Sequence, residues 1–514
     1  MIQIKNMRRV CSALLSTTML VAPAAAEDQD LEARVNALEA KLDLILERIG
    51  GGATITTDDA RVIDDAGTII RRLPALQNTP PSGSATELTP TAKVIESEYG
   101  AINNAVAANN GDPFVPAPIL VELDSPTGTS AQTDPGSGSL GEPKTSKRGI
   151  GFTKAGTEFN FRGYVKVDTI VTDFSGGDLP SSSLGRDFYI PSLIPVGGES
   201  DGADFDFNAR ETRFIFDVYT QRGGHDIGGL IELDFQVTSD GNETVSNSFT
   251  PRVRQAYFTF DNWLVGQAWS TFQNVGALPD NLDFIGPTEG TVFIRQPMIR
   301  YTKGPWQIAV EQPETEVTGP DGSRLLPGDD LGPDFILRYN HQRDWGSLTL
   351  AAIGRALHVE DDIIPGAISD TVAGYGLSAS GKLNVGEKDD FRFMATYGEG
   401  IGRYVGITLV NDVAVKADGK LNPIELFSSF ASYRHFWSKR WRSNLTGGFF
   451  QASNPVELVG DTVTDRVFSV HANLIWTPVD KIDVGVEYIY ANRRLESGDD
   501  GDMNRVQFSA KYSF

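Results

Sequence analysis

Charged side chains that recur at every second position are the residues of this chain best suited to chemistry. A Lys, Arg, Asp or Glu alternates there with apolar neighbours, as on the polar face of a β-strand. Clustered arginines on a low-dielectric wall attract anions, and a guanidinium binds a carboxylate through two parallel hydrogen bonds. The alternative is that each arginine only neutralises a neighbouring acid. The basic positions are Arg162, Lys166, Arg213, Arg338, Arg355, Lys382, Arg392 and Arg442, and the acidic ones are Asp168, Asp217, Glu232, Asp234, Asp483 and Glu487.

A second group of candidates lies in residues 272–293, between two strand-like segments at 263–271 and 294–302. This connection is longer than a hairpin needs, and it mixes Asp280 and Asp283 with apolar residues such as Phe284. Arg295 and Arg300 follow it directly. We expect a connection with this apolar content to fold inward and form a constriction; a plain external loop is the alternative.

The sequence predicts no catalytic residue, metal ligand or cofactor. The five histidines, residues 225, 341, 358, 435 and 471, are scattered without an i, i+4 pair, and no phosphate loop or nucleophile elbow occurs. The only cysteine is Cys11. A Ser/His/Asp set assembled from distant strands remains open as a weaker alternative, which would make the protein a hydrolase.

The elements that must position these residues are strands, and they begin at Thr157. The clearest alternating segments are 158–173, 225–237, 373–385, 391–397, 468–476 and 482–490. Tight turns at 222–224, 303–304, 343–344, 386–388 and 479–480 alternate with long acidic loops at 176–203, 315–332 and 360–370. We count about sixteen strands.

A soluble β-sandwich also alternates, but three features favour a transmembrane barrel. The strand segments reach the ~10 residues that a tilted membrane strand requires. Short and long connections alternate, as in outer-membrane barrels. Aromatic residues gather at the segment ends, as an interfacial girdle would: Trp263, Trp306, Trp345, Trp437, Trp441 and Trp476. The predicted fold is therefore an all-β, transmembrane antiparallel β-barrel over residues 157–514. The net charge of −23 argues against a nucleic-acid partner.

The N-terminal 156 residues divide into three predicted parts. Residues 1–26 have the basic start, the apolar core and the small-residue cleavage site of a secretory signal peptide. Residues 27–50 form an amphipathic helix, and residues 51–156 form a Pro- and Gly-rich periplasmic linker.

The helix has the 4-3-4-3-4 spacing of a coiled-coil seam. Arg34 and Glu39 flank the seam, in a pattern that resembles trimeric coiled coils. An ordinary amphipathic surface helix is the alternative. The seam comprises Leu31, Val35, Leu38, Leu42, Ile45 and Ile49.

The last segment alternates Val506, Phe508, Ala510, Tyr512 and Phe514 with polar residues. It resembles the C-terminal recognition signal of outer-membrane barrels. We therefore expect Phe508, Tyr512 and Phe514 to engage the barrel-assembly machinery.

Three runs carry a family resemblance: residues 163–168 (GYVKVD), 210–214 (RETRF) and 254–257 (RQAY). Residues 266–272 (GQAWSTF), 278–280 (LPD) and 295–297 (RQP) add to it. Together they resemble the DcaP-like family of trimeric outer-membrane porins. The resemblance implies a sixteen-stranded barrel, a homotrimer with an N-terminal periplasmic coiled coil, and uptake of dicarboxylate-like anions.

The functional hypothesis is passive diffusion of small anionic solutes through a trimeric porin in the outer membrane of a Gram-negative cell. The N-terminal region would be periplasmic, and outer-membrane lipid and lipopolysaccharide would surround the barrel. The competing hypothesis is a structural or adhesive barrel whose helix and linker reach into the periplasm.

Overall fold

The computed structural model describes residues 62–63, 69–70, 149–237, 241–242, 247–319, 322–328, 330–361, 368–416 and 418–514. The chain divides into two units, Met1–Val121 and Glu122–Phe514. In the first unit, β1 (Val62–Ile63) pairs antiparallel with β2 (Ile69–Ile70). The predicted signal peptide and helix 27–50, with its seam and Arg34 and Glu39, lie outside the described residues.

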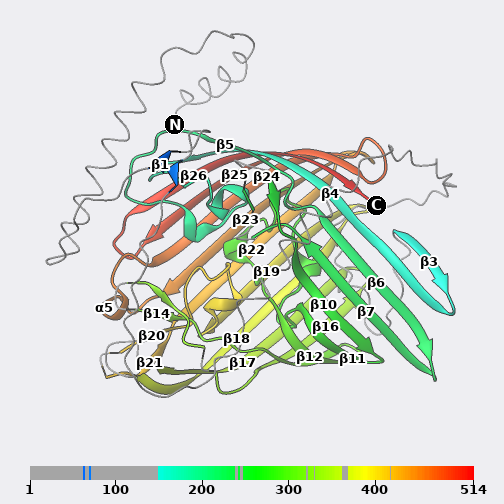
Figure 1. The fold of residues 1–514 in the computed structure, drawn as a ribbon, viewed down its shortest axis with the longest axis horizontal. Coiled ribbons are helices and arrows are strands. Elements are labelled where there is room, and N and C mark those ends of the chain that lie inside the picture. The colour runs from blue at the N-terminus through cyan, green and yellow to red at the C-terminus, as the bar shows by residue number, and fades with distance from the viewer. Residues whose placement is uncertain are drawn as a thin grey trace, which may run out of the picture. The chain divides into compact units, whose positions relative to one another are not determined.

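The second unit is built around a closed antiparallel barrel (Figure 1). Each strand pairs with the next along the chain, so the sheet is an up-and-down meander. Its segments are β3 (Ile150–Lys154), β4 (Thr157–Phe174), β5 (Asp204–Asn208), β6 (Arg213–Arg222), β7 (His225–Asp234), β10 (Arg252–Phe260), β11 (Trp263–Trp269), β12 (Arg295–Lys303), β13 (Trp306–Glu311), β16 (Asp334–Arg343), β17 (Gly346–Asp361), β18 (Ile368–Val385), β19 (Asp389–Glu399), β22 (Glu425–Phe436), β23 (Trp441–Ser453), β24 (Thr464–Trp476), β25 (Ile482–Leu495) and β26 (Asp500–Ser513).

These segments occupy sixteen positions in the wall. β5 and β6 pair with successive stretches of β4, so they are two halves of one wall strand. β3 pairs with β4 beyond the point where the pairing of β26 with β4 ends. The sixteen-stranded prediction is confirmed. The sheet begins at Ile150, however, inside the segment predicted as linker.

Short turns lie at one rim of the barrel and most of the long loops at the other. We name the loops L1 (175–203), L2 (235–251), L3 (270–294), L4 (312–333), L5 (362–367), L6 (400–424), L7 (454–463) and L8 (496–499). L5 is shorter than predicted because β17 and β18 extend into it. The six tryptophans predicted to form a girdle are all exposed, and all lie at the turn rim.

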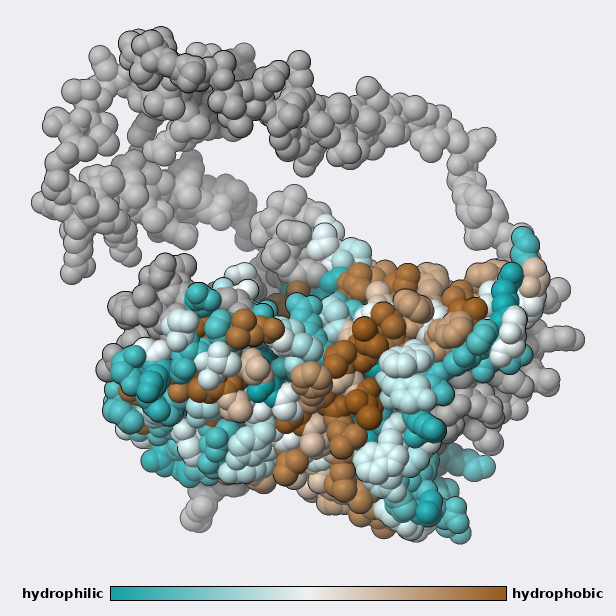
Figure 2. Space-filling view, turned by 90° about the horizontal axis from the view of Figure 1, so that it is seen from below, coloured by the Kyte–Doolittle hydropathy of each residue, from teal (hydrophilic) through white to brown (hydrophobic). Residues whose placement is uncertain are grey.

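The two faces of the wall differ in chemistry because strand side chains alternate. In β26, Phe508 and Tyr512 are half exposed on the outside, whereas Arg505, Gln507 and Ser509 are buried on the inside. Apolar side chains gather over the middle of the outer wall, with hydrophilic ones towards its ends (Figure 2). An apolar outer band around a polar interior is the pattern of a membrane barrel.

The loops carry secondary structure of their own. L4 and L6 form a small sheet in the order β15 (Arg324–Leu325), β14 (Val317–Thr318), β20 (Val413–Val415) and β21 (Leu421–Pro423). L1 contains the helix α4 (Leu184–Asp187), L7 contains α5 (Val456–Val459), and L2 contains the pair β8 (Gly241–Asn242) and β9 (Ser248–Phe249). None of the helices in the described part is long and apolar enough to cross a membrane.

Candidate functional site

L3 folds into the barrel, and most of its residues are buried. The backbone N–H of Ser270 donates to the carbonyl oxygen of Ile294 at 3.1 Å and closes the neck of the loop. Asn274 caps the short turn η3 (Val275–Ala277) by accepting from Gly276 N–H. A buried loop needs partners for its polar groups, and L3 finds them on the inner wall.

The first half of L3 is attached to β16, β18 and β19. Asn274 donates to the Ser380 hydroxyl at 3.0 Å. Arg338 donates to the carbonyl oxygen of Gln273 and, at 3.3 Å, to the side-chain oxygen of Asn274. Arg392 donates to the carbonyl oxygen of Leu278. Two predicted lumenal arginines therefore hold the backbone of L3.

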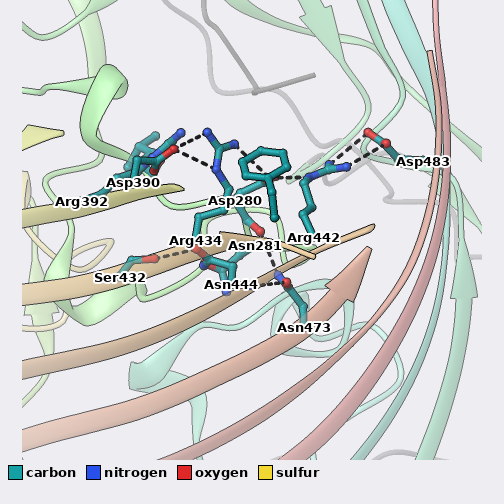
Figure 3. A network of polar contacts seen from close by, with 12 residues as sticks. Asp280, Asn281, Asp390, Arg392, Ser432, Arg434, Arg442, Asn444, Asn473 and Asp483 are labelled. Atoms are coloured by element: carbon teal, nitrogen blue, oxygen red, sulfur yellow. Dashed lines mark hydrogen bonds and ion pairs between the residues drawn. The ribbon is translucent and has the colours of Figure 1, made fainter. Parts of the chain in front are cut away.

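The tip of L3 is an ion-pair network centred on Asp280 (Figure 3). One Asp280 carboxylate oxygen accepts from Arg442 Nε at 2.7 Å and from Arg434 Nη1 at 3.1 Å. Arg442 also pairs with Asp483 at 3.2 Å, and Arg434 pairs with Asp390. Each arginine thus bridges the loop to a carboxylate of the wall, which fixes the position of the tip.

Beyond the tip, L3 is bound to the strands that close the barrel. Glu487 on β25 accepts from Asn281 Nδ2 at 3.0 Å and from Leu282 N–H at 2.8 Å. Lys166 on β4 donates to the carbonyl oxygen of Leu282 at 2.6 Å. Asn473 on β24 donates to the carbonyl oxygen of Asp280 at 2.8 Å. L3 therefore extends across the lumen from β11 to the opposite wall.

The return of L3 lies directly against β22 and β23 through the turn η4 (Thr288–Gly290). A Cβ atom at Gly290 would lie 2.3 Å from the carbonyl oxygen of Ser429, and one at Gly448 would lie 2.1 Å from Glu289 Oε1. Only glycine permits this approach of loop to wall.

Beneath η4 the fold brings together a serine, a histidine and a glutamate. Ser469 Oγ lies 3.0 Å from His471 Nε2, and His471 Nδ1 lies 3.6 Å from Glu487 Oε1. These distances resemble those of a hydrolytic triad. However, Ser469 donates to Glu289, and all four side chains are buried under L3. A carboxylate beside the hydroxyl would repel a developing oxyanion, so the set supports the loop rather than a nucleophile.

Two further loops pack on L3. The L1 residues Phe188 and Tyr189 are buried, and the backbone N–H of Tyr189 donates to Asp283 at 2.8 Å. From L6, Val405 forms a bridge with Val292, and the Tyr404 ring meets that of Phe272 edge-on. The predicted long loop at 176–203 is present as L1, and its apolar centre is buried against L3.

Of the nine residues predicted to face solute, six form ion pairs within the barrel. Their partners lie on nearby strands, on the same strand two residues away, or in the loops. The pairs are Arg162–Asp217 at 3.0 Å, Lys166 with Asp168 and Glu211, Arg213–Glu232 at 3.2 Å, Arg355 with Asp334 at 3.1 Å and Asp412 at 2.8 Å, Arg392–Asp390 at 2.7 Å, and Arg442 with Asp280 and Asp483.

Arg295 differs from these six. Its guanidinium lies over the Trp269 ring, 4.6 Å from the centroid, and over Phe293 at 5.6 Å, and within the described residues it has no ion pair. Arg338 bonds only to neutral oxygens among the residues described. Arg300 lies on the inner face of β12, between the exposed Ile299 and the partly buried Tyr301.

The three residues predicted to line the constriction have different surroundings. Asp280 is neutralised by two arginines, as described above. Asp283 accepts from the backbone N–H groups of Ile285 at 3.2 Å and Gly286 at 3.1 Å and thereby shapes the loop. Phe284 packs edge-on against Phe188 of L1.

Sequence reasoning missed three buried arginines. Arg254 pairs with Glu232 and Asp234 at 2.7 Å, and Arg434 holds Asp280. Arg505 donates to Thr172 Oγ1 at 2.8 Å. Arg505 could have been found, because it shares the inward phase of Gln507 and Ser509. Arg434 could not, since the alternation around 427–433 is irregular.

The predicted assembly residues are at the end of the wall. The carbonyl oxygen and N–H of Phe514 exchange hydrogen bonds with Gly163 of β4 at 3.3 and 3.0 Å, and its ring meets Phe161. Phe508 and Tyr512 are exposed on the outer face.

A comparison with protein families matches residues 137–514 to the model described as "DcaP outer membrane protein". Among solved structures, the outer membrane channel DcaP of Acinetobacter baumannii shares 24% identity, with 71% of this chain and 100% of that chain covered and a TM-score of 0.58. OmpT of Vibrio cholerae (9% identity, 71% and 100% covered, TM-score 0.43) and OmpF of Salmonella typhi in complex with daunomycin (12%, 71% and 100%, TM-score 0.44) also match. No curated protein matches the chain.

Proposed function

Since this chain belongs to the DcaP family and is an outer-membrane porin rather than an enzyme, we propose that its solutes are small anions, dicarboxylate-like in character. The observation that carries the proposal is Arg295, a partly buried cation beside the neck of L3 that has no ion pair among the described residues. The other predicted cations are mostly neutralised within the wall. Arg295 would therefore dominate the field that a solute meets.

The surroundings of Arg295 suit transient binding. Its guanidinium lies over the Trp269 and Phe293 rings, which support its position without supplying negative charge. A carboxylate could bond to its free edge and leave again, because a conducting pore needs weak binding. Arg300 on β12 and Arg338 on β16 would add further positive charge. L3, fixed at Asp280, would set the size limit.

Replacing Arg295 by Gln should lower the anion/cation permeability ratio. A unit charge ~5 Å from an ion in water contributes about 0.8 kcal/mol, which corresponds to roughly fourfold in local anion concentration. The measurement is the reversal potential of single channels in a KCl gradient across a planar bilayer. Arg300→Ala is expected to act in the same direction.

The matched control is Arg466→Gln, which removes an arginine from the exposed side of β24. It should leave the reversal potential unchanged. An Arg295→Gln channel with the parental reversal potential would overturn the proposal.

We further propose that the protein is a homotrimer held in part by helix 27–50, whose seam matches a three-stranded coiled coil.

A further inference from the structure

A cavity lies outside the lumenal site, among the loops at the outer rim. It has a volume of about 150 Å³ and lies where L4, L6 and L7 meet the outer ends of β24 and β25. The elements around it, β14, β20 and α5, appear at the lower left of Figure 1. Its lining includes Arg324, Arg493, Leu409, Val410 and Val463.

Arg493 is held in place by neutral groups alone. Its Nε donates to Thr464 Oγ1 at 3.0 Å, and its Nη1 donates to the carbonyl oxygens of Ser192 at 2.7 Å and Ile194 at 3.0 Å. No carboxylate in the described part of the chain pairs with it. A partly buried arginine normally has an anionic partner, so this positive charge is uncompensated within the described fold. The three hydrogen bonds leave Nη2 for an external group.

Arg324 adds a second cation to the cavity. Its Nε donates to Asn411 Oδ1 at 2.6 Å and lies 3.5 Å from Glu316 Oε2, so its charge is partly compensated. Another polar residue of the lining is Asn454, whose amide donates to Glu496 at 2.8 Å. Arg493 is therefore the cation that an incoming anion would meet with least competition.

We propose that this cavity is an outer capture site for a small carboxylate with an apolar body. The carboxylate would bind Arg493, and the body would lie against Leu409, Val410 and Val463. A cavity of ~150 Å³ holds a molecule the size of benzene. The inference rests on the proposed anion uptake, to which it adds a site on the external side of L3.

The test uses Thr462, an exposed residue of the cavity lining. Cys11 is the only cysteine and lies in the predicted signal peptide, so Thr462→Cys supplies the sole thiol of the processed chain. The rate of its modification by a neutral methanethiosulfonate is measured on the purified, folded protein in detergent. Benzoate is the probe, and benzamide is its uncharged counterpart.

Benzoate should slow the modification and benzamide should not. Adding Arg493→Gln should raise the half-protecting benzoate concentration at least roughly tenfold, because a charge-assisted hydrogen bond is lost. Arg466→Gln is the control and should preserve protection. Equal protection by both probes, absence of protection in Thr462→Cys alone, or parental protection with Arg493→Gln would overturn the capture site.

Arg493 also supports L1, so two checks separate lost binding from a disturbed loop. Arg493→Lys keeps the charge and should retain part of the protection, whereas complete loss with Lys would count against a charge-based site. Arg324→Gln removes a side chain that bonds to L6 rather than to L1, and it should weaken protection by a smaller factor. Parental protection with Arg324→Gln would remove that residue from the site.

The reversal potential separates this inference from the proposed lumenal function. Arg493→Gln should leave it at the parental value, because Arg295 remains. If Arg295→Gln leaves selectivity unchanged while benzoate still protects Thr462→Cys, anion selection in the lumen is wrong and the outer site stands. If Arg295 controls selectivity and benzoate does not protect, the outer site is wrong.

Discussion

Whether a charged side chain in this barrel can attract a solute depends on whether a neighbouring side chain already neutralises it. Arg442, for example, is neutralised by Asp280 and Asp483, whereas Arg295 and Arg493 have no ion pair within the described residues. A buried charge without a partner is costly, and such positions therefore tend to be functional. For this reason each of the two proposed anion sites contains one such arginine, Arg295 in the first and Arg493 in the second.

Glu316 provides a prediction at the same scale. It lies in L4 at the start of the loop sheet, where burial and the nearby Asp412 raise the pKa of its carboxyl to about 7, against an ordinary 4.5. Because the folded loop binds the proton more tightly, the sheet is most stable below pH ~4.5 and loses stability as the pH rises to about 7.

Hydrogen exchange can measure this change. The N–H of Val413 donates to the carbonyl oxygen of Glu316 at 3.2 Å. Its protection, corrected for the intrinsic rate, should fall between pH 5 and pH 8 and should be nearly constant in Glu316→Gln. Equal pH dependence in both proteins would contradict the prediction.

At the scale of elements, L3 is a loop that is held by many contacts, as a segment of the core would be. Its backbone and side chains bond to β4, β16, β18, β19 and β22 to β25, and L1 and L6 pack on it. Such a loop is held at many points, so no single bond carries its position. The tip is the most charged of these points, and we expect it to be the most sensitive to a single substitution.

Asp280→Asn should loosen the tip and leave Arg434 and Arg442 less neutralised. Breaking a largely buried ion pair by removing one partner typically costs ~3 kcal/mol or more, which here acts on the loop rather than the whole barrel. We expect noisier open-channel current and a higher anion/cation permeability ratio in planar bilayers. Asp201→Asn, which removes the same charge from an exposed position in L1, is the control. Quiet channels with parental selectivity would show that the tip is held without Asp280.

For the whole molecule, we expect the closed wall and the N-terminal region to have separate roles. The barrel closes without a free edge because β26 pairs with β4. The predicted helix 27–50 lies outside the described residues, and its proposed role is assembly. Fewer than three heptads are marginal as an isolated helix, so the helix would need its partners in the trimer.

Deleting residues 27–49 should reduce the yield of crosslinked trimer without unfolding the barrel. Amine crosslinking in detergent measures the first effect, and the gel shift between heated and unheated samples measures the second. A milder variant, Leu38→Asp, should act in the same direction because it places a charge in the seam. An unchanged trimer yield in both would remove the helix from assembly.

The sequence by itself was sufficient to predict the strands of the barrel wall and the direction in which their side chains face. Period-two alternation identified the strands, the turn rim and the inward position of Arg162, Arg338 and Arg392, because the facing of a strand residue is a local property. Only the tertiary structure decided which charges remain unpaired. Asp280 meets Arg442 from 162 positions away, and L1 and L6 cover L3 without any periodic signal. Ion pairing in a closed barrel depends on which side chains meet across the lumen. The distances between those side chains are set by how the barrel closes and how the loops pack inside it.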